Sequence, residues 1–334
     1  MTPDPVRAIA DAVLYEGYIL WPYRRSALKN QRRFTFGGVY PPAHSRDHPD
    51  DPAAMHNEVL MVASERAYLE VTVRFLQVVR RAVGRHGPGG FEQVDELDLG
   101  GDRYTTWEEA TEREVKSPPA ALRNLARGPL RTSIAIHAGR KTEELAGGAG
   151  ALVRTWHGLE GEVVLAAERV DAEDVWRVSV HIENTTTFAG GSREEALART
   201  FCSTHTVLHA SEGEFVSLAD PPEDLKAVAA ACHNAGSWPV LVGDPGRRTT
   251  VLSSPIILED YPRVAPESPG DLFDGGEIDQ MLVLNILALT DEEKAEMAAS
   301  DPRAREILER TEALTPDQLM ALHGTIREFG VAAG

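Results

Sequence analysis

The chain has 334 residues, a formal net charge of −18 and 42% hydrophobic residues, a composition that indicates a folded globular protein with one large domain and an appendage, or two domains. The strong negative charge disfavours binding to nucleic-acid phosphates. No apolar run approaches the roughly 18 residues of a membrane helix and the start of the chain lacks a signal-peptide pattern, so we expect a cytoplasmic protein without membrane insertion.

The opening segment is rich in aromatic and basic residues. Residues 15–40 hold seven of the 21 aromatics, and six cations but no acid lie between residues 17 and 46. These side chains are either core and edge-strand residues with arginine stems lying over rings, or a recognition surface, because tyrosine, tryptophan and arginine are enriched at binding hot spots. The candidate partner-binding residues are Tyr18, Trp21, Tyr23, Arg24, Arg25, Lys29 and Arg32.

Period-two alternation indicates strands from about residue 58 onward. In YLEVTVRF, Leu69 and its alternate neighbours form one apolar face, and in VWRVSVHIEN the apolar face begins at Trp176. Further short strands are predicted at EVLMVAS, LRTSIAIHA, LVRTWHGLEG and EVVLAAERV. We therefore predict that residues 1–190 form a β-rich body, an antiparallel sandwich or a barrel-like sheet.

Residues 191–262 are predicted to be an α+β segment packed on that body. Ser192 followed by Glu195 fits a capping box, so a helix should begin near Arg193. THTVLHASEGEFVSL is compatible with a β-hairpin, PEDLKAVAAACHNAG with a helix, and WPVLVG and TTVLSSPIIL with strands.

Residues 263–334 are predicted to be a linker and a helical tail. The stretch from Tyr261 to Gly275 is rich in proline and glycine, and four helices are expected between about 276 and 329. Two of them should start at Thr290 and Asp301, and a third at Thr315. The expected fold class is thus α+β, a sheet-rich body with a C-terminal α-helical tail.

The tail also bears on the role of the opening segment. Residues 267–334 hold 15 acids and five bases. The cationic opening segment therefore either packs on acidic parts of the same chain or faces an acidic partner.

The spacing in CSTHTVLH indicates a candidate metal site. On a helix, Cys202, His205 and His209 would share one face, and a thiolate with two imidazoles suits zinc or nickel. Cys232 could supply a fourth ligand if the two segments meet. The alternatives are a strand, on which the two histidines but not Cys202 share a face, and buried structural residues.

A second candidate lies at CHNAGSWPVLVG, where a tight turn follows a predicted helix. Cys232, Asn234 and Trp238 could line a pocket there, although such turns commonly serve chain reversal only. The adjacent Glu108 and Glu109 are interpreted as solvated. No phosphate-binding glycine loop and no nucleophile elbow occurs, so the sequence indicates no reaction.

Several segments resemble an uncharacterised protein family associated with NiFe hydrogenase gene clusters of actinobacteria. They are DAVLYEGYILWPYRRSALKNQ, CHNAGSWPVLVG, LSSPIILEDYPRVAPESPGDLFDGGEID, LALTDEEKAEM and DPRAREILERT. The likeness covers both ends of the chain well and residues 85–170 only weakly. The resemblance implies a role in hydrogenase assembly, in metal or cofactor handling, or in docking to a hydrogenase subunit. It identifies no catalytic residues.

The leading hypothesis is a non-catalytic accessory protein for hydrogenase assembly, maturation or docking, with a hydrogenase subunit or maturation factor as partner. The alternative is a metal-dependent enzyme or metallochaperone that uses the cysteine and histidine residues. A third possibility is a β-sandwich that binds a small ligand in an apolar cavity. Whether the chain forms a homo-oligomer stays open.

Overall fold

A computed structural model describes residues 5–15, 17–18, 20, 23–24, 26–31, 33–34, 36–87, 90–170, 174–263 and 283–315. The chain divides into two compact units. The larger unit comprises Met1–Ile19 and Arg32–Pro262, and the smaller unit comprises Leu20–Gln31 and Arg263–Gly334. The predicted body and α+β segment therefore share the larger unit, while a piece of the opening segment joins the tail in the smaller one.

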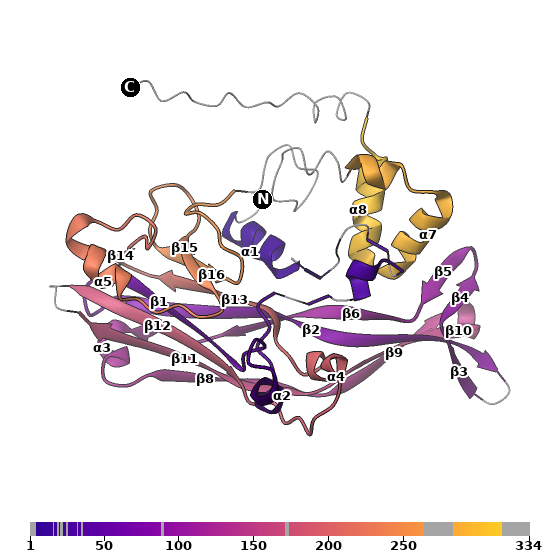
Figure 1. Cartoon of the computed structure of the whole chain (residues 1–334), viewed down its shortest axis with the longest axis horizontal. Helices are drawn as coiled ribbons and strands as arrows, with labels where there is room; N and C mark the ends of the chain where they lie inside the picture. Colours follow the sequence, from indigo (N-terminus) through magenta and orange to yellow (C-terminus); the bar gives the residue numbers. More distant parts are fainter. Residues whose placement is uncertain are drawn as a thin grey trace. The chain divides into compact units, whose positions relative to one another are not determined.

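One sheet of the larger unit has five strands, all antiparallel to their neighbours. Figure 1 shows most of it in the foreground. In spatial order its strands are β14 (Glu214–Phe215), β1 (Ala54–Val62), β12 (Val175–Asn184), β11 (Leu159–Arg169) and β8 (Leu130–Ile136). The strand predicted from VWRVSVHIEN has the same limits as β12, because its apolar alternation is unbroken.

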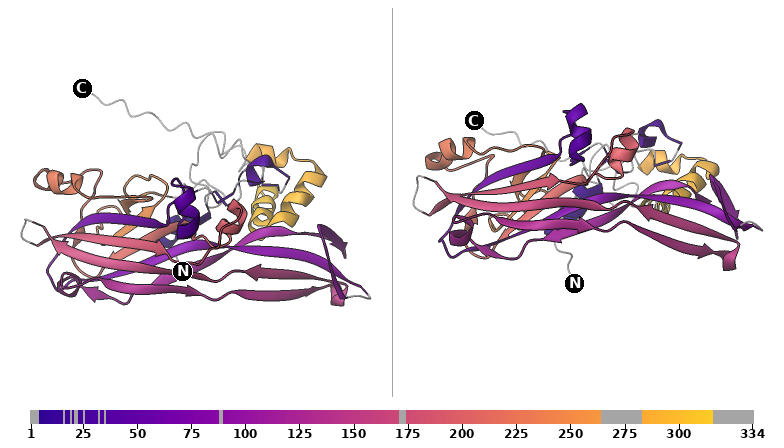
Figure 2. Two further views of the ribbon diagram at one scale, coloured as in Figure 1. Left: turned by 60° about the horizontal axis from the view of Figure 1, so that its bottom comes forward. Right: turned by 90° about the horizontal axis from the view of Figure 1, so that it is seen from below.

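The second sheet has nine strands and is organised around the 20-residue strand β2. Its main path is β15 (Trp238–Leu241), β16 (Thr250–Ser254), β13 (Cys202–Ala210), β2 (Tyr68–Gly87), β10 (Gly150–Trp156) and β9 (Gly139–Leu145). Three more strands pair with β2, namely β3 (Gly90–Val94), β6 (Trp107–Lys116) and β7 (Ala120–Ala121). A separate hairpin consists of β4 (Glu96–Leu99) and β5 (Asp102–Thr105), and the views of Figure 2 show it at one end of the long strands.

The main core lies between the two sheets. Val71, Val73 and Phe75 of β2 belong to the same buried cluster as Val178 and Ile182 of β12. Side chains of period-two strands alternate between the two faces, so each sheet contributes one apolar face to this core. The expected α+β fold with a sheet-rich, sandwich-like body is confirmed.

Short helices connect and cover the strands of the larger unit. They are α1 (Pro5–Tyr15), α2 (Pro42–Asp47), α3 (Leu122–Leu125), η2 (Ala146–Gly148), α4 (Arg193–Leu197), η3 (Glu223–Leu225) and α5 (Lys226–Ala230). The capping box predicted at Ser192 and Glu195 is present, with both reciprocal hydrogen bonds. The helix that follows is only five residues long, and β13 starts at Cys202.

A second core lies under α1, on the outer face of the nine-stranded sheet. Leu14 and Tyr18 pack in one buried cluster with Leu76 and Val78 of β2. Arg74, also on this face, donates a 2.5 Å hydrogen bond to Asp11 of α1. The helix is thus fixed by apolar packing and by a nearly buried guanidinium.

The predicted hairpin over residues 204–218 does not form. β13 pairs with β2 and β16, whereas β14 pairs with β1 through Met61 and Phe215. The turn between β13 and β14 therefore carries the chain from one sheet to the other. The charged strands β3 to β6 and β9 were not predicted, because few of their alternate positions are apolar.

The smaller unit contains η1 (Leu28–Gln31), a helical stretch at 283–287, α7 (Asp291–Ser300) and α8 (Pro302–Glu312). The helix starts expected at Thr290 and Asp301 are confirmed, and Thr290 forms a capping box with Glu293. Most of the predicted linker and the predicted helix after Thr315 lie outside the described residues. None of the helices described in either unit is long and apolar enough to span a bilayer.

Candidate functional site

The opening segment is divided between the two units. Gly17 accepts a 3.0 Å backbone hydrogen bond from Phe34, so the chain leaves the larger unit and returns to it at adjacent points. Tyr18 belongs to the larger unit, whereas Tyr23, Arg24 and Lys29 belong to the smaller unit. Of the other predicted partner-binding residues, Trp21, Arg25 and Arg32 lie outside the described residues.

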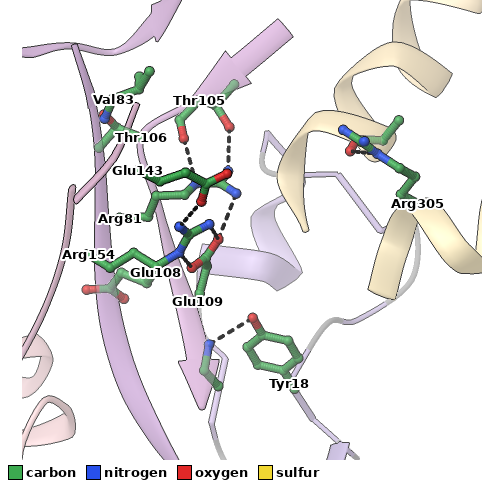
Figure 3. Close-up of polar contacts among 12 residues, drawn as sticks. Tyr18, Arg81, Val83, Thr105, Thr106, Glu108, Glu109, Glu143, Arg154 and Arg305 are labelled. Carbon is green, nitrogen blue, oxygen red and sulfur yellow. Dashed lines mark hydrogen bonds and ion pairs between the residues drawn. The ribbon is translucent and has the colours of Figure 1, made fainter. Parts of the chain in front are cut away.

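Tyr18 is buried, with 2% of its surface exposed. Its hydroxyl oxygen accepts a 3.0 Å hydrogen bond from the backbone N–H of Ala110 in β6 (Figure 3). Among the strands of the described residues, β6 pairs with β2 alone, so its other edge has no neighbouring strand there. Tyr18 bonds to a backbone group at this edge and is not available to a partner, contrary to the prediction.

Arg33 acts on the same edge, although it was not among the predicted residues. Its Nη1 donates a 2.8 Å hydrogen bond to the carbonyl of Glu108, and its Cζ lies 3.9 Å from the centre of the Trp107 ring. This geometry is a cation–π contact. Together, Tyr18 and Arg33 bond to two backbone groups at this edge of β6, which is the internal-packing alternative for this part of the opening segment.

In the smaller unit, Arg24 is neutralised by the chain's own acidic tail. Its Nη1 lies 2.5 Å from Oε1 of Glu293 in α7. A hydrogen bond from the Thr290 backbone and then the charge of Arg24 hold the pKa of Glu293 below its usual value. Arg24 was predicted to face a partner, but its guanidinium is engaged within the chain.

Further contacts hold the segment around Arg24 to α7 and to itself. The Ser26 backbone N–H donates a 2.7 Å hydrogen bond to Glu296, and the Ser26 hydroxyl donates a 3.0 Å bond to the other oxygen of that carboxylate. The Asn30 amide donates to the carbonyls of Leu20 and Arg24 at 3.0 and 2.8 Å. The segment is therefore a hydrogen-bonded turn docked on α7.

This turn leaves two neighbouring side chains in solvent. Leu28 is 80% exposed, Lys29 is also exposed, and Lys29 makes no ion pair among the described residues. Tyr23, by contrast, is 7% exposed. Leu28 and Lys29 are thus accessible side chains on a hydrogen-bonded turn, and we call this pair the turn surface.

The predicted metal site at Cys202, His205, His209 and Cys232 is wrong. Residues 202–210 form strand β13, not a helix, and a register irregularity separates Cys202 from His205. Within the part of the chain that the structure describes, no three histidine, cysteine or acidic side chains are grouped to hold a metal ion. A helix would have gathered Cys202, His205 and His209 on one face, whereas on a strand the two histidines do not share a face with Cys202.

The individual environments of these residues are also poor for metal binding. Burial raises the pKa of the Cys202 thiol to about 12 and lowers the pKa of His205 to about 4. His209 is exposed and contacts the Thr250 hydroxyl at 3.1 Å. Cys202 and His205 behave as core side chains, and His209 is an exposed side chain on an interior strand of the sheet.

The residues of the second candidate site occupy different structural environments. Burial raises the pKa of the Cys232 thiol, and the nearby Arg177 opposes this shift. The Asn234 side chain accepts a 3.0 Å hydrogen bond from the backbone N–H of Glu58, so it bonds to the backbone of β1. Trp238 is 43% exposed at the start of the edge strand β15. Asn234 thus serves the chain reversal that was the alternative for this turn.

A buried carboxylate was missed by the sequence reasoning. Glu109 is 8% exposed, not solvated, and contacts two guanidinium groups, as the dashed lines in Figure 3 show. Arg81 donates to it at 2.8 Å and Arg154 at 2.6 Å, and Arg154 also donates to Glu143 at 2.7 Å. Arg81 of β2 faces Arg154 of β10, and Glu109 lies on β6 two residues beyond Trp107, the partner of Arg81. Only the strand register reveals this arrangement.

Comparison with models of known protein families found no match, and comparison with curated proteins found no related sequence. The features that bear on function are therefore the turn surface, the acidic tail that holds it, and the resemblance to the hydrogenase-associated family.

Proposed function

We propose that the protein is a non-catalytic accessory protein that binds a subunit or maturation factor of a NiFe hydrogenase through the turn surface. The resemblance to the hydrogenase-associated family supports the identity of the partner. Two of the regions that carry this resemblance, residues 20–31 and helices α7 and α8, lie about 260 residues apart in the sequence and belong to one compact unit.

The observation that carries the proposal is the exposed leucine on a fixed turn. Leu28 leaves 80% of its surface in solvent, while Ser26 and Asn30 on either side of it are held by hydrogen bonds. Burying a leucine side chain contributes about 1.5–3 kcal/mol. A turn that is already ordered loses little conformational entropy when a partner binds it.

The charge around this leucine indicates the kind of partner surface that fits. Arg24 is paired with Glu293, whereas Lys29 makes no ion pair within the described part of the chain and is available to an external carboxylate. The complementary surface is an apolar pocket with an acidic rim. Aliphatic contact would supply affinity, and the lysine would supply orientation.

The test is affinity purification of the tagged protein from cells that express the hydrogenase. We expect hydrogenase subunits or maturation factors to co-purify with the wild type and to be lost with Leu28→Glu. The matched control is Ile257→Glu, which alters another aliphatic residue, 77% exposed, in the larger unit. The proposal fails if the wild type recovers no hydrogenase component, or if both variants recover the same amount as the wild type.

A further inference from the structure

Two connections run from one sheet to the other at the same level of the larger unit, and we call them the crossings. The chain passes from β8 to β9 through His137 and Ala138, and from β10 to β11 through His157 and Gly158. The last paired positions on either side are Ile136 with Leu159 and Gly139 with Trp156. The two crossings therefore lie opposite each other, outside both hydrogen-bonded ladders.

Hydrogen bonds from side chains to backbone carbonyls hold the crossings in place. The Trp156 indole N–H donates a 3.0 Å hydrogen bond to the carbonyl of His137, and Gln77 donates a 2.6 Å bond to the carbonyl of His157. A β-carbon at Gly158 would lie 3.3 Å from the carbonyl oxygen of Ile136, which is tighter than usual contact. Both histidine side chains are thus attached to a fixed backbone.

An open cavity of about 350 Å³ lies at these crossings. Its lining includes both histidines, Gly158, Glu160, Thr187 and Arg199. The volume is at the lower end of the range for small-ligand sites, about 300–1,000 Å³. Unlike the apolar cavity considered as the third possibility, it combines imidazole, guanidinium, hydroxyl and carboxylate groups.

Arg199 gives this cavity its positive charge. Its Nη1 donates a 2.9 Å hydrogen bond to the backbone carbonyl of Glu195, and its Cζ lies 5.6 Å from the Phe188 ring. It makes no ion pair with a carboxylate among the described residues. A guanidinium has five N–H donors in a planar fork that matches carboxylate and phosphate oxygens, so donors remain for a ligand.

The electrostatics of His157 agree with a positive local potential. Burial first, and then the charges of Arg199 and Arg80, lower the pKa of His157, while Glu195 opposes them. This local sign is opposite to the net charge of the chain, −18. An anionic group that entered the cavity would meet a cation and two imidazoles.

We propose that this cavity binds a small organic oxyanion, a carboxylate or a phosphate ester, whose charged group is held by Arg199. His137 and His157 flank the charged group and donate to it from their ring nitrogens. Glu160 is the one carboxylate among the described lining residues, and it selects ligands that also carry a hydroxyl or ammonium donor. This site is independent of the turn surface.

The experiment is a titration of the full chain with glycerol 3-phosphate, malate or inorganic phosphate at constant ionic strength, monitored by the NMR signals of the histidine rings. We expect saturable shifts of His137 and His157 with at least one of these probes. His86 should not shift, since it is paired with Glu144 at 3.1 Å and is not among the cavity residues. A response to the phosphates alone or to malate alone decides between the two ligand chemistries.

Two arginine variants provide a matched comparison. Arg199→Gln should weaken binding at least tenfold, whereas Arg66→Gln, which alters an exposed arginine outside the cavity lining, should bind as the wild type does. The proposal is overturned if no probe shifts the two histidines beyond a sodium chloride control. It is also overturned if folded Arg199→Gln binds with unchanged affinity.

Discussion

At the residue scale, Glu109 is a charged side chain in a largely buried environment. It is 8% exposed and accepts hydrogen bonds from both Arg81 and Arg154, so its charge is matched within a largely desolvated site. A buried ion pair of this kind adds little net stability, but removal of one partner leaves an uncompensated charge in the protein interior. Glu109 therefore holds two guanidinium groups that the larger unit cannot easily leave unpaired.

Replacement of Glu109 tests this assignment. Glu109→Gln should lower the free energy of unfolding by about 3 kcal/mol, because Arg81 and Arg154 lose their shared counter-charge. Glu143→Gln is the matched control, since its side chain is 52% exposed and also contacts Arg154; it should cost less than about 1 kcal/mol. Urea unfolding of both variants gives the comparison, and equal effects would contradict the assignment.

Sequence alone could not identify this residue. Glu108 and Glu109 are adjacent, and alternation along a strand places one of them on each face. Which face is buried depends on the pairing of Glu109 with Val79 and of Trp107 with Arg81, a register set about 30 residues away along the chain. Sequence alone also could not decide between a helix and a strand for the segment that contains Cys202 and His209, because their spacing is compatible with both.

At the scale of elements, the opening segment protects an edge. β6 has the sequence WEEATEREVK, in which charged residues occupy most of the alternate positions, so apolar periodicity gave no signal for it. The strand pairs on one side with β2, and on the other side Tyr18 and Arg33 bond to its backbone. Exposed edges favour pairing with other chains, and covering them is a common way to prevent it.

The hydroxyl of Tyr18 supplies one of these bonds, and its removal is a direct test. Tyr18→Phe keeps the ring in the second core but leaves the Ala110 N–H without its acceptor, so the free energy of unfolding should fall by about 1–2 kcal/mol. Tyr68→Phe, at a 48% exposed tyrosine, should change it by less than about 0.5 kcal/mol. Chemical denaturation followed by circular dichroism measures both, and a neutral Tyr18→Phe would refute the role of the hydroxyl.

Elements with uninterrupted local signals were predictable from the sequence. β12 alternates apolar and polar residues along its whole length, and the capping boxes at Ser192 and Thr290 each combine an oxygen-bearing cap with a glutamate three residues later. These signals depend on neighbours in the chain. The separation of β14 from β13 depends on a tertiary partner, β1, and could not be inferred locally.

At the scale of the whole molecule, residues near the two ends of the sequence contact each other within the smaller unit. The sequence placed positive charge in the opening segment and negative charge in the tail, and left open whether the two meet. The ion pair between Arg24 and Glu293 and the bonds of Ser26 to Glu296 join them within the smaller unit. The turn surface of Leu28 and Lys29 is accessible, and the proposed docking depends on it.

Amide hydrogen exchange of Ser26, Ala27 and Asn30 tests this arrangement most directly, because their N–H groups donate to Glu296, to the Arg24 carbonyl and to the Ala27 carbonyl. We predict that these amides are protected in the wild type and exchange faster in Glu296→Ala, which removes the acceptor of the Ser26 N–H. Glu306→Ala, a change at an exposed acid of α8 that pairs with Arg310, should leave the protection intact. Unprotected amides in the wild type, or equal protection in Glu296→Ala and the wild type, would contradict a turn that is held by the tail.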